Sequence, residues 1–153
     1  VCADDGLSCT TDTCDGAGVC GHASTCDDGN ACTTDTCGLG GCASAPIPGF
    51  AGAECRLDAL IADITTAGDV DAGTQPRLLR PVTRSKDSVE RADALAASGR
   101  AHSASRRLRT AARKLATFEK LVARLAQRLN ISSAMAARFR AQADTIIAAI
   151  GTL

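Results

Sequence analysis

The sequence predicts a small disulfide-rich repeat module followed by an all-α antiparallel bundle of three or four helices. All nine cysteines lie within the first 55 of the 153 residues, and part of that segment occurs twice. The remainder is rich in Ala, Leu and Arg, with apolar residues at helical spacing. We place the repeats at 1–42 and the bundle at 54–153. Between them, the two prolines and two glycines of 43–53 predict an extended linker.

Two similar units make up the cysteine-rich segment. Residues 9–14 read CTTDTC and recur without change as residues 32–37, a shift of 23 positions. Upstream, the Asp-Asp-Gly of residues 4–6 recurs at 27–29 with the same shift. Six identical residues at a fixed spacing are a strong indication of a tandem repeat.

The cysteines are predicted to form disulfides. Residues 1–42 contain few apolar side chains, so a segment this small needs cross-links or a metal to offset its chain entropy. Cysteine at this density indicates an oxidising compartment, and each bond stabilises by about 2–4 kcal/mol. A metal–thiolate site is the rival interpretation, but the paired Cys-x2-Cys spacing of zinc sites is absent. The predicted disulfide cysteines are Cys2, Cys9, Cys14, Cys20, Cys26, Cys32, Cys37, Cys42 and Cys55.

Because nine is an odd number, one cysteine is unpaired or bonded to another chain. Cys2, near the terminus, and Cys55, beyond the repeats, are the candidates. A bond between Cys42 and Cys55 would clamp the linker, although sequence alone does not determine connectivity.

The second unit, CDDGNACTTDTC followed by Gly-x-Cys, resembles the cysteine-rich repeats of slime-mould extracellular-matrix proteins, which also appear in predicted secreted bacterial proteins. The resemblance covers residues 2–42 and implies a secreted, disulfide-bonded structural module. The first unit departs from the pattern, because Leu7 stands where the second has Asn30, and Ala3 is inserted.

Acidic residues around the repeated glycine suggest a calcium site, since Ca²⁺ takes six to eight oxygen ligands. The candidate ligands are Asp27, Asp28, Asn30 and Asp35, with Asp4, Asp5 and Asp12 in the first unit. The other interpretation is a turn in which the Asp side chains accept hydrogen bonds from their own backbone. The spacing is not that of an EF-hand, and the sequence leaves both interpretations open. No other cofactor is predicted.

The threonine pairs of the repeats also have two interpretations. Thr10, Thr11, Thr33 and Thr34 either carry O-linked sugars or simply favour extended backbone.

Four helices are expected, at 54–64, 76–97 and 101–129 and after Ser132 or Ser133, either of which can cap the last one. The third has apolar residues at alternating spacings of three and four, at Leu108, Ala111, Leu115, Phe118, Val122, Leu125 and Leu129. The fourth is expected to bury Met135, Phe139, Ala143, Ile146 and Ile150. Short loops favour packing within one chain, while a rod that pairs between subunits is the alternative.

The composition excludes several functional classes. No apolar run reaches the roughly 20 residues of a membrane span. No nucleophile elbow, phosphate loop or His-Glu-x-x-His motif occurs, so we expect no enzyme. With no Trp, no Tyr and three Phe, aromatic stacking on nucleic-acid bases or on sugars is not expected.

The charges divide the chain into two halves of opposite sign. Residues 1–55 hold eight acids and no Lys or Arg, whereas 56–153 hold 17 bases and nine acids. This predicts a homo-oligomer formed through the oppositely charged halves, unless the halves neutralise each other within one chain. The expected function is a secreted structural protein, extracellular, on the cell surface or periplasmic, and a subunit of a fibre or matrix. The alternative is a secreted binding module that uses the acidic loops for calcium, or the basic helices for an anionic surface or polysaccharide.

Overall fold

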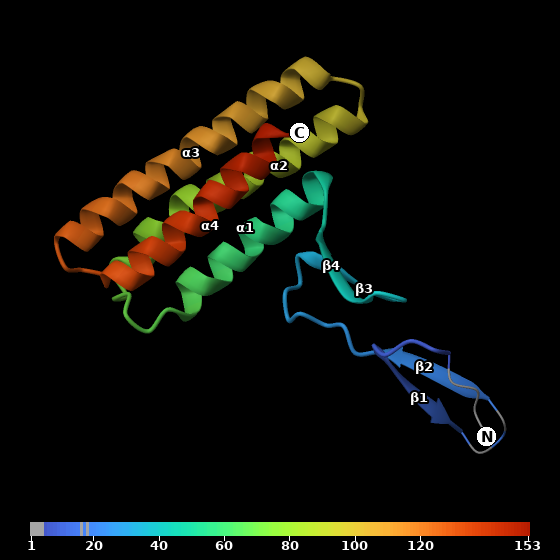
Figure 1. Cartoon of the computed structure of the whole chain (residues 1–153). Helices are drawn as coiled ribbons and strands as arrows, with labels where there is room; N and C mark the ends of the chain where they lie inside the picture. Colours follow the sequence, from blue (N-terminus) through green and yellow to red (C-terminus); the bar gives the residue numbers. More distant parts are fainter. Residues whose placement is uncertain (1–4, 16, 18) are drawn as a thin grey trace. The chain divides into compact units, whose positions relative to one another are not determined.

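The computed structural model describes residues 5–15, 17 and 19–153, which belong to two compact units (Figure 1). We call Val1–Ile47 the hairpin unit and Pro48–Leu153 the helical unit. The predicted fold class, a disulfide-rich module followed by a helical bundle, is confirmed. The boundary places Glu54 in the helical unit, so the two units carry formal charges of −7 and +7.

Each repeat of the hairpin unit forms one antiparallel two-stranded sheet. The strands are β1 (Thr10–Cys14), β2 (Cys20–Ser24), β3 (Thr33–Gly38) and β4 (Gly41–Pro46). Threonine favours extended backbone, which explains why the repeated CTTDTC segments supply β1 and β3. An isolated two-stranded hairpin is only marginally stable in water, so these sheets depend on their cross-links.

The linker expected at 43–53 is not present. Residues 43–46 belong to β4, and the first helix, α1 (Gly49–Thr66), begins three residues after that strand ends. Pro46 is the last residue of a strand in a two-stranded sheet, where its missing N–H leaves no ladder bond unmade. Pro48 is the N-cap of α1. The prolines therefore end a strand and start a helix instead of separating the two units.

Four helices form an antiparallel bundle, in which each helix packs on the next and α4 returns to α1 (Figure 1). The three that follow α1 are α2 (Gln75–Ala97), α3 (Ala101–Gln127) and α4 (Ser133–Gly151). Pro76 lies in the first turn of α2, and Pro81 is accommodated inside that helix without ending it. Ser132 caps α4, as predicted, by accepting a hydrogen bond from the Met135 N–H at 3.2 Å.

The predicted apolar faces of α3 and α4 form the core, with one exception. Phe118 and Phe139 are fully buried, and their ring centroids lie 6.3 Å apart. Leu129, expected to continue the face of α3, is 90% exposed. The helix ends at Gln127, and Leu129 has a φ of 58°, which turns it away from the core.

Within the part of the chain that the structure describes, no helix combines the length and apolarity that crossing a bilayer requires.

Candidate functional site

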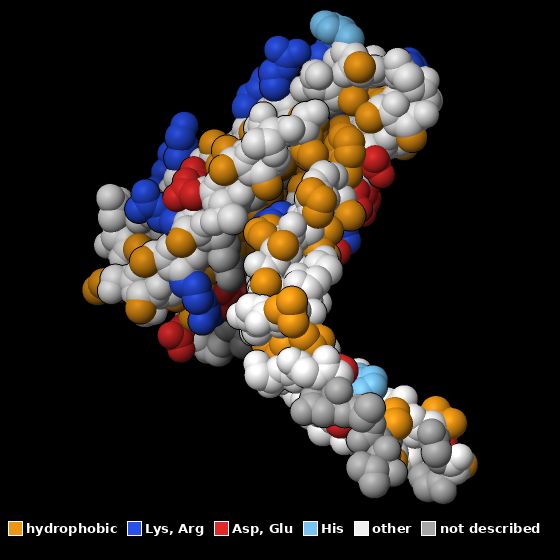
Figure 2. Space-filling model, turned by 45° about the vertical axis from the view of Figure 1, so that its right-hand side comes forward, with side chains coloured by type: hydrophobic (Ala, Val, Ile, Leu, Met, Phe, Trp, Pro, Cys, Tyr) orange, Lys and Arg blue, Asp and Glu red, His pale blue; other side chains and the backbone are white. Residues whose placement is uncertain are grey.

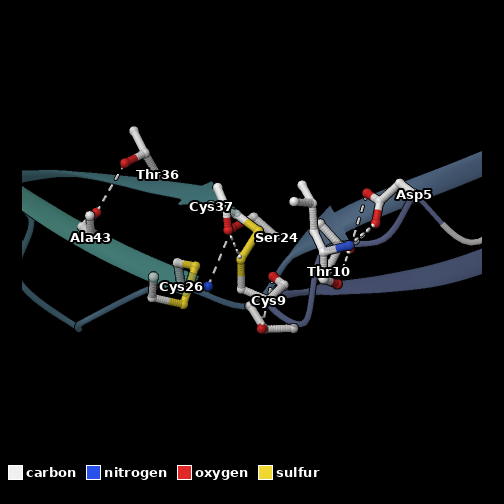
Figure 3. The surroundings of a disulfide bond; sticks show 12 residues. Asp5, Cys9, Thr10, Ser24, Cys26, Thr36, Cys37 and Ala43 are labelled. Carbon is white, nitrogen blue, oxygen red and sulfur yellow. Dashed lines mark hydrogen bonds between the residues drawn. A yellow bond between two sulfur atoms is a disulfide. The ribbon is translucent and has the colours of Figure 1, made fainter. Parts of the chain in front are cut away.

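Disulfides replace an apolar core in the hairpin unit, and Figure 3 shows the surroundings of one of them. Cys9 is bonded to Cys37, and Cys26 is bonded to Cys42. The sulfur atoms of Cys9, Cys26 and Cys42 lie within 4.8 Å of one another. Because these sulfurs are bonded in pairs, they are not thiolates that could hold a metal. Cys14, Cys32 and Cys55 are disulfide-bonded as well.

Of the two candidates for the odd cysteine, Cys55 is wrong. Cys55 is disulfide-bonded, and Cys20, which is exposed on β2, is the free cysteine among the residues described. Cys2 lies outside those residues. Cys42 is bonded to Cys26 and not to Cys55, because β4 returns the chain to the start of its own repeat, where the two Cα atoms are 5.1 Å apart.

The first repeat holds its turn together through Asp5. The Asp5 Oδ1 accepts hydrogen bonds from the Leu7 N–H and the Thr10 hydroxyl, each at 2.9 Å. The backbone hydrogen bond from Leu7 is the main reason that the pKa of Asp5 lies below its ordinary value. Gly6 supplies the positive φ, 74°, that this turn requires. The Asp5 carboxylate therefore stabilises a turn, which is the interpretation that the sequence offered beside a calcium site.

The second repeat reproduces this turn with Asp28. Its Oδ1 accepts hydrogen bonds from the Asn30 N–H at 2.8 Å and the Thr33 hydroxyl at 2.9 Å, which lower the pKa of Asp28. Asn30 adds a bond that Leu7 cannot make, because its Oδ1 accepts from the Cys32 N–H at 3.0 Å. The sequence difference between the repeats thus costs the first one a hydrogen bond.

Carboxylates converge beside each turn, but the two clusters differ. In the second repeat, oxygens of Asp27, Asp28 and Asp35 lie within 4.8 Å of one another. The Asp35 Oδ2 accepts from the Asp28 N–H at 3.2 Å, whereas the buried Oδ1 has no hydrogen-bond partner in the described part of the chain. An unpartnered carboxylate oxygen is an available ligand atom for a hard cation.

In the first repeat a histidine joins the carboxylates. The His22 Nδ1 is 2.6 Å from the Asp12 Oδ1 and 3.6 Å from the Asp5 Oδ2, while Asp4 lies outside the described residues. Sequence reasoning missed His22 because it is ten positions from Asp12. The β1–β2 register places the two directly opposite each other, whereas Asp35 faces Ser44 in the second hairpin.

The threonine pairs separate into two kinds. The hydroxyls of Thr10 and Thr33 donate hydrogen bonds within the turns. Thr11 and Thr34 are exposed. An O-linked sugar is therefore easier to accommodate on Thr11 and Thr34.

A row of basic residues follows the exposed face of α3, and Lys and Arg side chains gather along one edge of the helical unit in Figure 2. We call this row the basic stripe, and it consists of Arg106, Arg109, Arg113, Lys120, Arg124 and Arg128. Spacings of three, four and seven place these residues on one side of the helix. In the described chain none of them has a carboxylate within 4.0 Å. The ion pairs of the helical unit are made by Lys86 and Arg138 instead. The stripe is thus a surface of uncompensated positive charge.

The fold and these surfaces define a class of protein, disulfide-bonded hairpin repeats joined to a four-helix bundle with a basic face. No family model, no curated protein and no solved structure matches the chain. The functional argument therefore depends on the charges, the cysteines and the geometry described above.

Proposed function

We propose that this protein is a secreted, non-catalytic structural protein that assembles head to tail into an extracellular fibre or matrix. The observation that carries the proposal is the division of charge between the two compact units. The hairpin unit has seven acids and no Lys or Arg, and the helical unit has a basic stripe on α3 without ion pairs in the described chain. The disulfides are those expected in an oxidising compartment. The resemblance of the repeats to slime-mould matrix repeats supports the same setting.

The assembly uses a different surface on each side of the contact. The acidic hairpin unit of one copy faces the basic stripe of the next, so every copy keeps one surface for each neighbour. Such a contact closes into a ring or extends into a filament. Screening limits charge attraction to about 8–10 Å at physiological salt, so the carboxylates must reach the guanidinium groups directly.

Sedimentation velocity and electron microscopy of the full chain test the proposal. We expect assemblies at physiological salt that dissociate at about 1 M salt, where the screening length falls to about 3 Å. The stripe variant (Arg113→Gln, Lys120→Gln and Arg124→Gln) should sediment as a monomer. A matched control removes three exposed charges from α2 instead, at Arg77, Arg80 and Arg84. Wild-type protein that stays monomeric at physiological salt would refute self-assembly.

Calcium binding by the second repeat is a further candidate function, favoured by the unpartnered Oδ1 of Asp35. Titration calorimetry with CaCl2 should show binding that Asp35→Asn abolishes. Asp12→Asn is the control, because Asp12 is paired with His22 in the other repeat. A wild-type chain that releases no heat, and melts at the same temperature with Ca²⁺ or a chelator, would exclude this function.

The basic stripe also suits an anionic polysaccharide. α3 has 27 residues and is about 40 Å long, so the stripe can follow a polymer over several sugar units. We expect the protein to be retained on a sulfated-polysaccharide column and eluted by salt, and the stripe variant to elute earlier than the α2 control. Equal elution of both variants would refute a role for the stripe.

A further inference from the structure

A hollow of about 480 Å³ lies where α2 turns into α3. Its volume is in the range of ligand pockets in proteins, about 300–1,000 Å³. We call it the arginine hollow, and its lining residues are Leu95, Arg100, Ser103, Arg106, Arg107 and Thr110. Arg106 belongs to the basic stripe as well, so the hollow opens onto one end of that stripe.

The electrostatics of the arginine hollow favour an anion. Three of its six lining residues are arginines, none is acidic, and none of the three arginines has an ion pair within the described chain. α3 begins at Ala101, so the positive end of its dipole lies at the same end of the helix. Positive charge is therefore concentrated here beyond what the stripe alone provides.

The two hydroxyl groups that line the hollow differ in the hydrogen bonds that they can offer a ligand. Thr110 already donates its proton to the Arg106 carbonyl at 3.0 Å, so it can only accept from a ligand. The Ser103 hydroxyl makes no hydrogen bond to the described part of the protein, so its proton can be donated to an anion. The half-buried Leu95 adds an apolar wall.

We propose that the arginine hollow binds a sulfate or carboxylate group of an acidic polysaccharide. Arg100, Arg106 and Arg107 offer planar guanidinium groups that can grip such an oxyanion through paired hydrogen bonds. Ser103 donates a further hydrogen bond, and Leu95 contacts the apolar side of the sugar ring. This inference rests on the proposed polysaccharide binding by the basic stripe, within which it locates a specific subsite.

Other polyanions fit the hollow less well. Single-stranded nucleic acids are usually held by base stacking as well as charge, but the hollow has no aromatic lining residue. A membrane surface would need an apolar anchor beside the charges. The exposed large apolar side chains of the described chain are Val19, Leu39, Leu129 and Leu153, and none lines the hollow.

Titration calorimetry with a sulfated disaccharide, a carboxylated disaccharide and a neutral one tests the inference on the full chain. A disaccharide is too short to span the stripe, so variants at the two ends of the stripe can separate binding at the hollow from binding elsewhere. We expect binding of at least one charged sugar, and a loss of about tenfold or more in Arg106→Ala/Arg107→Ala, because a charge-assisted hydrogen bond is worth about 1.5–3 kcal/mol. Arg124→Ala/Arg128→Ala removes the same charge from the far end of the stripe and should change the affinity by less than about threefold.

Two single variants separate hydrogen bonding from charge. Ser103→Ala should weaken binding severalfold, whereas Thr110→Val should have little effect, because the Thr110 proton is already engaged. Equal losses of affinity in the two arginine double variants would overturn the proposed binding at the arginine hollow and would leave polysaccharide binding by the stripe intact. If neither the disaccharides nor a sulfated polymer binds, both proposals fail. Tighter binding of single-stranded DNA than of either charged sugar would also overturn the inference.

Discussion

Cys9 and Cys37 are joined by a disulfide that connects the second cysteine of one repeat to the third cysteine of the next, with Cα atoms 5.7 Å apart. The Cys26–Cys42 bond, in contrast, stays within the second repeat. One bond therefore closes a repeat and the other fastens two repeats together. This combination makes one unit from two hairpins that would each be only marginally stable.

Replacing both Cys9 and Cys37 by Ser should destabilise the hairpin unit by about 2–4 kcal/mol, because the closed loop of the unfolded chain is released. Hydrogen exchange should become faster in the four strands and stay unchanged in the helices. Cys20→Ser is the control, since that thiol is free and exposed. Strand amides that remain as protected as in the wild type would contradict a structural role for this bond.

Alkylation of the native, unreduced chain should label Cys20 and spare the disulfide-bonded cysteines. Peptide mapping by mass spectrometry identifies the modified site. Modification of Cys9, Cys26 or Cys42 under the same conditions would show that the hairpin unit is held by something other than these bonds.

Leu129→Gly should stabilise the helical unit by about 0.5–1 kcal/mol. Leu129 occupies the left-handed position after α3, where its N–H bonds the Ala126 carbonyl and the next N–H bonds the Leu125 carbonyl. Gly99 occupies the corresponding position after α2, with a φ of 75°. Gly99→Ala is therefore expected to destabilise the same unit. Chemical unfolding followed by far-ultraviolet circular dichroism measures both, and a less stable Leu129→Gly would count against the cap geometry.

Glu119 should make the helical unit less stable as the pH rises. Burial, followed by a hydrogen bond with Asp144, raises the pKa of Glu119 above its ordinary value of 4.5, and its Oε1 is buried without a partner in the described chain. Between the ordinary and the raised pKa the folded state binds more protons than the unfolded state, so stability falls with increasing pH.

Glu119→Gln removes this titration and should therefore raise the free energy of unfolding at pH 7 while leaving it little changed near pH 4. Asp87→Asn, a change at an exposed acid on α2, is the control. Chemical unfolding at several pH values from 4 to 8 provides the measurement. A Gln variant with the same pH dependence as the wild type would exclude Glu119 as its source.

The elements that follow from local pattern were predictable from the sequence. The seam through Leu115, Phe118 and Val122 identifies α3, and the six-residue identity identifies the two repeats of the hairpin unit, although not their strands. Contacts between residues that are distant in the sequence were not predictable. The meeting of His22 with Asp12 follows from the register of the first hairpin. The free cysteine and the partner of Cys42 depend on how the chain folds in three dimensions, which no local pattern specifies.

The linker was misjudged for a related reason. Proline and glycine are typical of spacers, but they also end strands and start helices, and Pro46 and Pro48 have these roles here. At the candidate site, the basic residues of α3 were visible in the sequence. Two features of the site could not be predicted without knowing how α2 packs against α3. These are the lack of acidic partners for the basic residues within the described chain and the hollow beside Arg106.

Mixing two complementary variants tests head-to-tail assembly most directly. An acid variant (Asp15→Asn and Asp27→Asn) keeps the side-chain oxygens that accept hydrogen bonds from the backbone and loses two charges of the hairpin unit. The stripe variant loses the opposite surface. Each should be a monomer alone, and sedimentation of an equimolar mixture should show a one-to-one dimer that grows no further, because only one pair of intact surfaces remains. A mixture that stays monomeric while the wild type assembles would contradict contact between the hairpin unit and the basic stripe.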